Sequence, residues 1–296
     1  MKKITGAHTA IITPFDKNQC IDWKKFEALV ERQIKAGIDG LVFVGTTGES
    51  PTLSHEEHVE LLKWSVKQVN KRVLVTHNIG SYNTRQSLAC AEAAAEAGAD
   101  LLMAVNPYYN KPNQEGLFQH YSAIANHTSL PLMVYNIKGR TCVNIETATL
   151  MRLAQNPKIV AVKEASADLA QQLDVIHVAP KNFSVLSGDD GNLLPFIASG
   201  GDGIVSVLAN VIPRYFSKLV HLLLEGKIVE ARPQFYKILD LIKIMFCDTS
   251  PIPVKAMMGL LGYCDPAVRL PLTCLSSDKL MQLKTFIPLV HELENE

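Results

Sequence analysis

The chain has 296 residues, with 29 basic and 29 acidic side chains, so its formal net charge is zero; 47% of its residues are hydrophobic and 20% are charged. This composition excludes a disordered chain, which combines low hydrophobicity with high net charge. Without a basic excess, we expect no nucleic-acid partner. The sequence also lacks the run of about 18 apolar residues that a membrane span needs and a typical secretory leader, so we expect a cytoplasmic protein.

Eight short apolar runs, rich in β-branched residues, recur along the chain. Runs that are apolar almost throughout are typical of parallel strands covered on both faces. The predicted strands are residues 7–15, 40–45, 73–78, 100–107, 131–136, 160–164, 183–189 and 203–207.

Amphipathic segments between these runs predict helices, among them residues 23–36, 54–70, 84–97 and 114–127. Ser54 and Glu57 form a capping-box pattern at the start of one of these helices. A weak repeat, Gly-x-Asp, ends three helical stretches just before an apolar run, because glycine is favoured at helix ends. Its copies begin at Gly37, Gly98 and Gly200.

This alternation predicts an α/β fold, a (β/α)₈ TIM barrel completed by about residue 210. We expect the barrel to occupy residues 1–224 and a helical extension, with about three helices, to occupy residues 225–296. A doubly wound sheet is the alternative. It is less favoured because eight units are many for such a sheet and no GxGxxG motif follows the first strand.

The cysteines and histidines form no recognisable metal-binding pattern. No cysteines form a CxxC pair and no histidines form an HExxH motif, so we expect reduced cysteines and no metal site. His55 and His58 share one helical face, and we interpret them as surface or second-site residues.

Lys163 ends the sixth predicted strand. In a (β/α)₈ barrel the active site lies at the carboxyl ends of the strands. Burial of an unpaired ammonium costs several kcal/mol, which favours a neutral amine that can form a Schiff base with a carbonyl group. The alternative is a structural ion pair, although Glu164 is a poor partner because adjacent strand residues point to opposite faces.

Other strand ends carry further candidate residues, each with a structural alternative. Thr46 and Thr47, in the glycine-flanked segment 45–49, offer hydroxyl and N–H groups to a carboxylate or phosphate, or form an ordinary turn. Tyr135 offers a phenol for proton transfer, or is a core tyrosine. Arg140 can bind a carboxylate through two hydrogen bonds, or lies on the surface.

Five short motifs lie at or just after the ends of predicted strands: GTTGE at 45–49, PYYN at 107–110, YNxxGRT at 135–141, VKEAS at 162–166 and SGDD at 187–190. Taken together, these motifs resemble the dihydrodipicolinate synthase family, within the superfamily of pyruvate-dependent class I aldolases. The resemblance covers essentially the whole chain.

The resemblance implies a lyase that condenses pyruvate with L-aspartate 4-semialdehyde in lysine and diaminopimelate biosynthesis. Lys163 would form an imine with pyruvate, so no separate cofactor is implied. Tyr135 would be the general acid and base, in a proton relay with Thr46 and Tyr109. Tyr109 would come from a neighbouring subunit, which implies a homo-oligomer, usually a dimer of dimers.

The same resemblance assigns substrate contacts. Thr47 and the backbone of Val205 would contact pyruvate, and Arg140 would bind the carboxylate of the aldehyde. Gly139 and Arg140 favour this aldehyde over the substrates of N-acetylneuraminate lyase or a 2-keto-3-deoxy sugar acid aldolase, the nearest alternatives. A non-catalytic regulator that binds pyruvate or an amino acid is a remote alternative.

The chain departs from the family pattern at Lys138, where proline is usual, and at residues 78–80, where a Gly-Thr-Gly turn is usual. Some members are inhibited by lysine at a subunit interface. The matching positions here are Ser50, His55, His58, Tyr82, Gln86 and Tyr108. Because Gln86 lacks the charge of the glutamate found in inhibited members, we expect weak or no inhibition by lysine.

Overall fold

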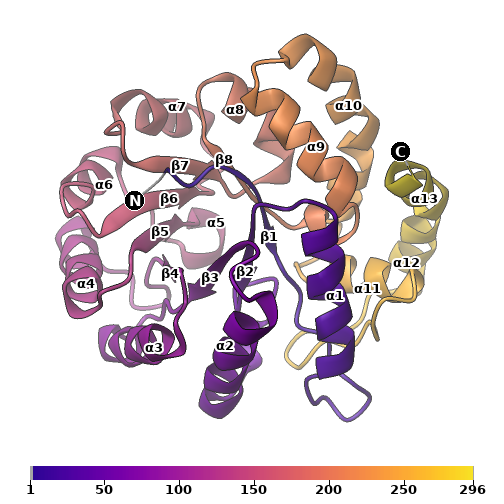
Figure 1. Ribbon diagram of the computed structural model, residues 1–296, viewed down its shortest axis with the longest axis horizontal. Coiled ribbons are helices and arrows are strands. Elements are labelled where there is room, and N and C mark those ends of the chain that lie inside the picture. The colour runs from indigo at the N-terminus through magenta and orange to yellow at the C-terminus, as the bar shows by residue number, and fades with distance from the viewer. Residues whose placement is uncertain (1–2, 296) are drawn as a thin grey trace.

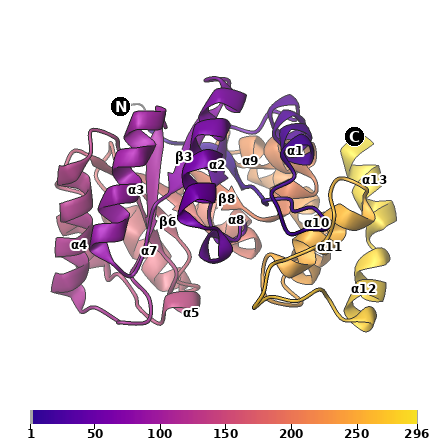
Figure 2. The ribbon, with the colours of Figure 1, turned by 90° about the horizontal axis from the view of Figure 1, so that it is seen from below.

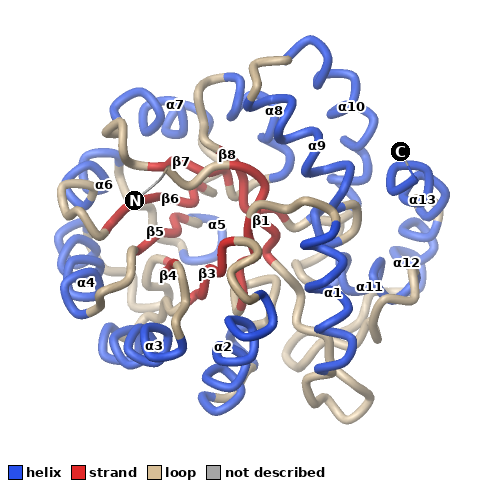
Figure 3. The backbone as a smooth tube through the Cα atoms, viewed as in Figure 1, coloured by secondary structure: helices blue, strands red, loops and turns tan. Residues whose placement is uncertain are grey.

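The computed structural model describes residues 3–295. Within this range eight parallel strands close into a barrel in chain order, and helices surround it (Figures 1 and 3). This confirms the predicted (β/α)₈ fold. The strands are β1 (Gly6–Ala10), β2 (Gly40–Phe43), β3 (Leu74–Asn78), β4 (Leu101–Val105), β5 (Leu132–Asn136), β6 (Ile159–Glu164), β7 (Ser184–Ser187) and β8 (Gly203–Ser206).

The helices between the strands agree closely with the sequence pattern. The four predicted helices correspond to α1–α4 and differ from them by one residue at most at either end. The helices of the barrel are α1 (Trp23–Lys35), η1 (Ser50–Thr52), α2 (His55–Val69), α3 (Thr84–Ala97), α4 (Gln114–His127), α5 (Lys138–Thr141), α6 (Thr147–Leu153), α7 (Leu169–Val178), η2 (Asp190–Asn192), α8 (Leu193–Ala198), η3 (Leu208–Asn210) and α9 (Pro213–Leu224).

Local capping explains why these helices begin and end where they do. The Ser54 hydroxyl accepts a hydrogen bond from the Glu57 N–H at 3.2 Å, and the Glu57 carboxylate accepts one from the Ser54 N–H at 2.9 Å. The predicted capping box of α2 is therefore confirmed. Gly98 ends α3 with a φ of +83°, a left-handed conformation that glycine adopts at no steric cost.

Several predicted strands are longer than the observed ones. The first apolar run, residues 7–15, forms a strand only as far as Ala10. Ile11, Ile12 and Phe15 remain buried beyond the end of β1. An apolar run reports burial, whereas a strand also needs a hydrogen-bonded neighbour, so the run overestimates the strand where a buried loop continues it.

The Gly-x-Asp repeat has a shared role at the amino ends of the strands. Each aspartate directly precedes an even-numbered strand. Its carboxylate accepts a hydrogen bond from a backbone N–H of the preceding strand and contacts a basic side chain. The amide donors to Asp39, Asp100 and Asp202 are Ala7, Val75 and Val185. Their ionic partners are His221, Lys71 and Lys3. We call these three residues the amino-end aspartates.

The C-terminal extension packs beside α1 and α9 on one side of the barrel (Figure 2). It contributes four helices to the described chain rather than the three expected. They are α10 (Ile228–Ile244), α11 (Ile252–Leu260), α12 (Ser277–Lys284) and α13 (Ile287–Asn295). We propose a boundary between residues 224 and 225, after the end of α9.

One apolar cluster joins the extension to the barrel: it includes Phe15 after β1, Phe216 of α9, and Leu241 and Met257 of the extension. None of the helices between residues 3 and 295 has the length and hydropathy needed to cross a membrane.

Candidate active site

Lys163 and Tyr135 lie side by side near the carboxyl end of the barrel. They are opposite each other in the parallel pairing of β6 and β5. The Lys163 Nζ lies 4.0 Å from the centre of the Tyr135 ring, within the range of a cation–π contact. Both side chains are buried, with exposed fractions of 6% and 4%. Strand pairing therefore brings an amine and a phenol together in a sheltered position.

Lys163 has no carboxylate partner among residues 3–295. Glu164 points away from it, as the alternation of strand side chains predicts. Its carboxylate accepts hydrogen bonds from the Asn136 Nδ2 at 3.0 Å and the Ser166 N–H at 2.7 Å. A structural ion pair with the adjacent glutamate is therefore excluded for Lys163.

Gly188, just after β7, makes room for the Lys163 side chain. A Cβ atom at Gly188 would lie 2.9 Å from Lys163 Cε and 2.7 Å from Ala165 Cβ. Both distances are shorter than the contacts that real Cβ atoms make. A side chain at position 188 would force the lysine to move.

Arg140 lies on α5 and is tied to the extension. Its Nη2 donates a hydrogen bond to the Ser250 carbonyl at 3.0 Å. The buried Asn106 anchors the same segment: its Nδ2 donates to the Val143 carbonyl at 2.6 Å, and its Oδ1 accepts from the Ile137 N–H at 3.3 Å. The guanidinium is exposed and lines the cavity described next, where it can meet an anion.

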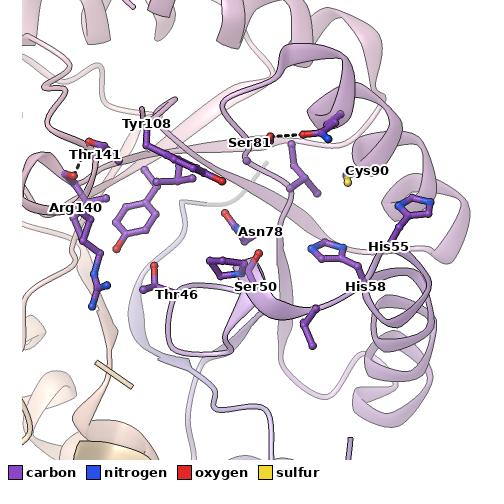
Figure 4. A pocket seen from close by; sticks show the side chains of 18 of the residues that line it. Thr46, Ser50, His55, His58, Asn78, Ser81, Cys90, Tyr108, Arg140 and Thr141 are labelled. Atoms are coloured by element: carbon purple, nitrogen blue, oxygen red, sulfur yellow. Dashed lines mark hydrogen bonds between the residues drawn. The ribbon is translucent and has the colours of Figure 1, made fainter. Parts of the chain in front are cut away.

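A cavity of about 520 Å³ opens at this end of the barrel. Thr46, Tyr135 and Arg140 line it. Five of the predicted effector positions line it as well: Ser50, His55, His58, Gln86 and Tyr108. Figure 4 shows Arg140 and Thr141 on one side of the cavity, His55 and His58 on the other, and Thr46 between them. The two predicted sites thus share one cavity.

Three predicted residues lie outside the lining of that cavity but next to it in the fold. Thr47 is buried directly after Thr46. Val205 is buried on β8 and belongs to the apolar cluster inside the barrel that includes Tyr135. Lys163 adjoins the cavity through its contact with the Tyr135 ring.

Two predicted tyrosines lie at the surface instead. Tyr109 is 90% exposed and its backbone is left-handed, with a φ of +66°. Tyr82 is 46% exposed and does not line the cavity; its ring meets that of Tyr108 edge-on, with centroids 5.2 Å apart. Within one chain, therefore, Tyr109 does not join Tyr135 and Thr46.

Two histidines near the cavity, His58 and His77, are poor cations. Burial, and secondarily the charge of His55, lowers the pKa of His58 to about 4. Burial, and secondarily His58, lowers the pKa of His77 to about 3. His77 is a core residue, because it is stacked on Phe43 and hydrogen-bonded to Ser65 at 2.7 Å. At neutral pH both rings are uncharged, so Arg140 gives the cavity positive charge.

Some cavity residues were missed by the sequence reasoning. Asn78, Ser81, Cys90 and Thr141 line the cavity. Asn78 is the last residue of β3, so the strand-end rule that selected Lys163 would also have found it. The other three follow strands at a distance or lie on a helix. Thr141 ends the YNxxGRT motif, whereas no pattern marks Ser81 or Cys90. No metal-binding group of histidine, cysteine or acidic residues occurs in the part of the chain that the structure describes.

Comparison with known proteins gives one consistent result. The model of the dihydrodipicolinate synthetase family matches residues 3–289. A 4-hydroxy-tetrahydrodipicolinate synthase from Leptospira biflexa is 45% identical over 291 residues, which are 98% of each chain. The structure of the 4-hydroxy-tetrahydrodipicolinate synthase from Methylacidiphilum fumariolicum superposes with a TM-score of 0.96, at 44% identity, over 98% of this chain and 97% of that one.

A second solved structure is a dihydrodipicolinate synthase from Acinetobacter baumannii, complexed with pyruvate. It superposes with a TM-score of 0.95 at 39% identity, over 98% of this chain and 99% of that one. Many unrelated enzymes share the barrel fold, so the fold alone would not show a family. Here the sequence identity extends over nearly the whole length of both chains. The chain belongs to the dihydrodipicolinate synthetase family.

Proposed function

We propose that this protein catalyses the reaction of a 4-hydroxy-tetrahydrodipicolinate synthase, a lyase reaction in which pyruvate condenses with L-aspartate 4-semialdehyde for lysine and diaminopimelate biosynthesis. The names of its relatives support this activity. The observation that carries the proposal is the position of Lys163: a buried amine with no carboxylate partner in residues 3–295, against the ring of Tyr135 and next to a cavity that Arg140 lines.

The first half of the reaction uses Lys163 as a nucleophile. Its Nζ attacks the ketone carbon of pyruvate to give a carbinolamine. A proton from the acid group assigned below lets the hydroxyl leave as water, and the electron pair of the nitrogen forms the C=N bond of an iminium. This cation accepts the electron pair of a methyl C–H bond when the proton leaves, which gives an enamine. The enamine carbon then attacks the aldehyde carbon of the second substrate. The covalent imine supplies the electron sink, so the proposal includes no cofactor.

Proton transfer is assigned to Tyr135, with Thr46 and Tyr109 as its relay partners. Thr46 and Tyr135 line the same cavity, which supports the first pairing. Tyr109 is 90% exposed, as expected of a residue that serves a neighbouring subunit. The proposal therefore includes a homo-oligomer, a dimer of dimers, in which two chains exchange this tyrosine across a tight interface. We also propose that the protein acts in the cytoplasm.

Substrate binding is divided between two groups of residues. Thr47 and the backbone of Val205 would hold pyruvate near Lys163, and both residues are buried near that end of the barrel. Arg140 would bind the carboxylate of the aldehyde, since a guanidinium can donate two parallel hydrogen bonds to such a group. Its exposure at the mouth of the cavity supports an encounter with the second substrate.

The experiment has two parts. A coupled assay measures condensation of pyruvate with aspartate semialdehyde, against a panel of sugar aldehydes. Borohydride reduction in the presence of pyruvate should then add about 72 Da to the peptide that contains Lys163, the mass of a reduced pyruvate imine. Turnover with sugar aldehydes alone would contradict the proposed substrate, and an unmodified Lys163 would contradict the mechanism.

Inhibition by lysine is expected to be weak or absent. Gln86 lies in the cavity at a position where a charged carboxylate would pair with an effector ammonium. Its Oε1 already accepts a hydrogen bond from the Ser81 hydroxyl at 2.8 Å. Titration of the condensation assay with lysine measures this, and half-inhibition below about 1 mM, a binding energy of about 4 kcal/mol, would contradict it.

A further inference from the structure

An ion pair between Glu49 and Lys255 is buried where the barrel meets the extension. The Lys255 Nζ lies 2.6 Å from the Glu49 Oε1, and the side chains are 0% and 1% exposed. The Lys255 Nζ is also 4.1 Å from the centre of the Phe15 ring. The second oxygen, Oε2, accepts a hydrogen bond from the backbone N–H of Arg269 at 2.9 Å. Both carboxylate oxygens are therefore held by the extension.

Such a pair is a costly way to join two parts of a protein. Each charge loses its hydration, and apolar side chains of similar size often stabilise a protein as well or better. Burial lowers the pKa of Lys255, and the charge of Glu49 opposes that shift. Two other ion pairs tie the extension to the barrel within the described chain: Arg32 with Glu294 at 3.0 Å, and Arg269 with Glu57 of α2. Attachment of the extension alone does not explain Glu49.

Glu49 is the last residue of the turn that carries Thr46 and Thr47. Its backbone is left-handed, with a φ of +57°. Its N–H donates a hydrogen bond to the Thr46 carbonyl at 3.1 Å, and its carbonyl accepts one from the Thr52 N–H at 3.0 Å. The position of Glu49 therefore determines the path of the two threonines.

The same turn starts from a strained residue. Val44 has a φ of +56°, a conformation that is an outlier for a β-branched side chain. Strain of this kind persists only where surrounding contacts hold it. The Asn78 Nδ2 donates to the Val44 carbonyl at 3.1 Å, and the Thr13 hydroxyl donates to the Gly48 carbonyl at 2.8 Å. Together with the Glu49 ion pair, these bonds hold the turn at three points.

We propose that Glu49 and Lys255 are positioning residues for pyruvate: through this buried pair the C-terminal extension fixes the turn that carries Thr46 and Thr47. The inference rests on the proposed function. The pair touches neither Lys163 nor Tyr135, so it acts on the turn rather than on the reacting atoms. A turn released from Glu49 shifts the hydroxyl and N–H groups of Thr47 away from the carboxylate of pyruvate, and a displacement of about 1 Å can cost up to about a hundredfold in rate.

The test uses the double variant Glu49→Gln/Lys255→Met in the full-length protein. Gln keeps an acceptor for the Arg269 N–H, and removing both charges avoids the destabilisation caused by one unpaired buried charge. We expect the half-saturating pyruvate concentration for the borohydride-trapped adduct to rise by about tenfold or more. The KM for aspartate semialdehyde should stay within about twofold of wild type, because Asn106, which the variant leaves unchanged, anchors the segment that carries Arg140.

Two further variants separate positioning from stability. Arg32→Met breaks the ion pair between Arg32 and Glu294, which ties the extension to the barrel away from the turn. It should lower the melting temperature and leave the half-saturating pyruvate concentration unchanged. Thr13→Val removes one uncharged tie of the turn with little change in shape. It should raise the half-saturating pyruvate concentration by a few-fold, and it decides the matter should the double variant not fold.

The outcomes distinguish this inference from the proposed function. A wild-type protein that forms no pyruvate adduct and no condensation product contradicts the proposed function. A wild-type protein that forms the adduct, alongside a folded double variant with half-saturation within twofold of wild type, overturns the positioning role. The positioning role would also be overturned if Arg32→Met and the double variant lost equal stability and raised the half-saturating pyruvate concentration equally.

Discussion

The two ends of the barrel use polar residues in opposite ways. At the amino end, each of the amino-end aspartates accepts a backbone hydrogen bond and contacts a basic side chain. At the carboxyl end, the side chains of Lys163, Tyr135 and Thr46 form no hydrogen bond with any residue between 3 and 295. The three aspartates at the amino end are satisfied by the protein, whereas these three side chains at the carboxyl end are available to a ligand.

This difference shows how one scaffold separates stability from chemistry. Buried polar groups without partners cost free energy, so a protein keeps them where a ligand supplies the missing partner. Because strand residues alternate between faces, the same strand can end in a satisfied residue and a free one. β6 illustrates this, since Glu164 is fully hydrogen-bonded and Lys163 is not.

The largest expected effect comes from removing the amine at the carboxyl end. Lys163→Ala should lower kcat by about 10⁴-fold or more, because loss of a nucleophile removes the covalent route entirely. Lys158 is the matched control: it precedes β6 at the opposite end and donates to the Thr128 carbonyl at 2.7 Å. Lys158→Ala should keep the pyruvate adduct and the condensation rate. If Lys158→Ala lost the pyruvate adduct as Lys163→Ala does, the reactive amine would not be confined to the carboxyl end of the barrel.

Arg140→Ala should affect the second substrate alone. A hydrogen-bonded charge pair is worth about 1.5–3 kcal/mol, so kcat/KM for aspartate semialdehyde should fall by about 10- to 100-fold. The pyruvate adduct at Lys163 should still form. Lys138→Ala, which removes another exposed cation from α5, is the control and should change kcat/KM by less than about threefold. Equal losses in the two variants would mean that general positive charge, not Arg140, selects the aldehyde.

A substitution at the amino end should affect stability and leave turnover unchanged. The Asp100 Oδ2 accepts a hydrogen bond from the N–H of the buried Val75 at 3.0 Å. Asp100→Ala leaves that amide without a partner, which should lower the free energy of unfolding by about 1–3 kcal/mol. Asp100→Asn keeps an acceptor for the Val75 N–H, so its free energy of unfolding should fall by less than that of Asp100→Ala. Chemical denaturation measures both, and a large fall in kcat at 25 °C would contradict the separation of the two ends.

Much of this architecture was predictable from the sequence, because apolar runs and helical periodicity are both local patterns. Apolar runs and helical periods identified the barrel, and the strand-end rule selected Lys163, Tyr135 and Thr46. Local patterns do not show which face a strand-end residue occupies. His77 and Asn78 are adjacent, yet His77 packs against α2 in the core and Asn78 lines the cavity.

Long-range pairs were beyond the sequence for a related reason. Glu49 belongs to the GTTGE motif, but its partner Lys255 lies 206 residues away in the sequence. The one sign was a lysine within the otherwise apolar segment of α11. A single sequence does not connect Glu49 with Lys255. The contact between the extension and the turn is seen only in the three-dimensional structure.

The smallest expected effect concerns pH and the amino end. A hydrogen bond with Asp39 raises the pKa of His221, although partial burial opposes this shift. Partial burial acts to raise the pKa of Asp39, but hydrogen bonds from His221 and the Ala7 N–H outweigh it and lower that pKa. Asp39 therefore stays ionised above pH 5, and His221 is the group that titrates near neutral pH.

For a histidine whose pKa is raised on folding, the stabilisation is fully present below the unfolded value of about 6.5 and is lost as pH rises through the folded value. His221→Gln should therefore lower the melting temperature more at pH 6 than at pH 8.5. His221 is 43% exposed at its side chain, so solvent screening limits the difference to about 1–3 °C. Asp100→Asn, at an amino-end aspartate whose partner is a lysine rather than a histidine, is the control and should show the same shift at both pH values. A pH-independent effect of His221→Gln would mean that the His221–Asp39 contact stabilises the amino end through packing rather than charge.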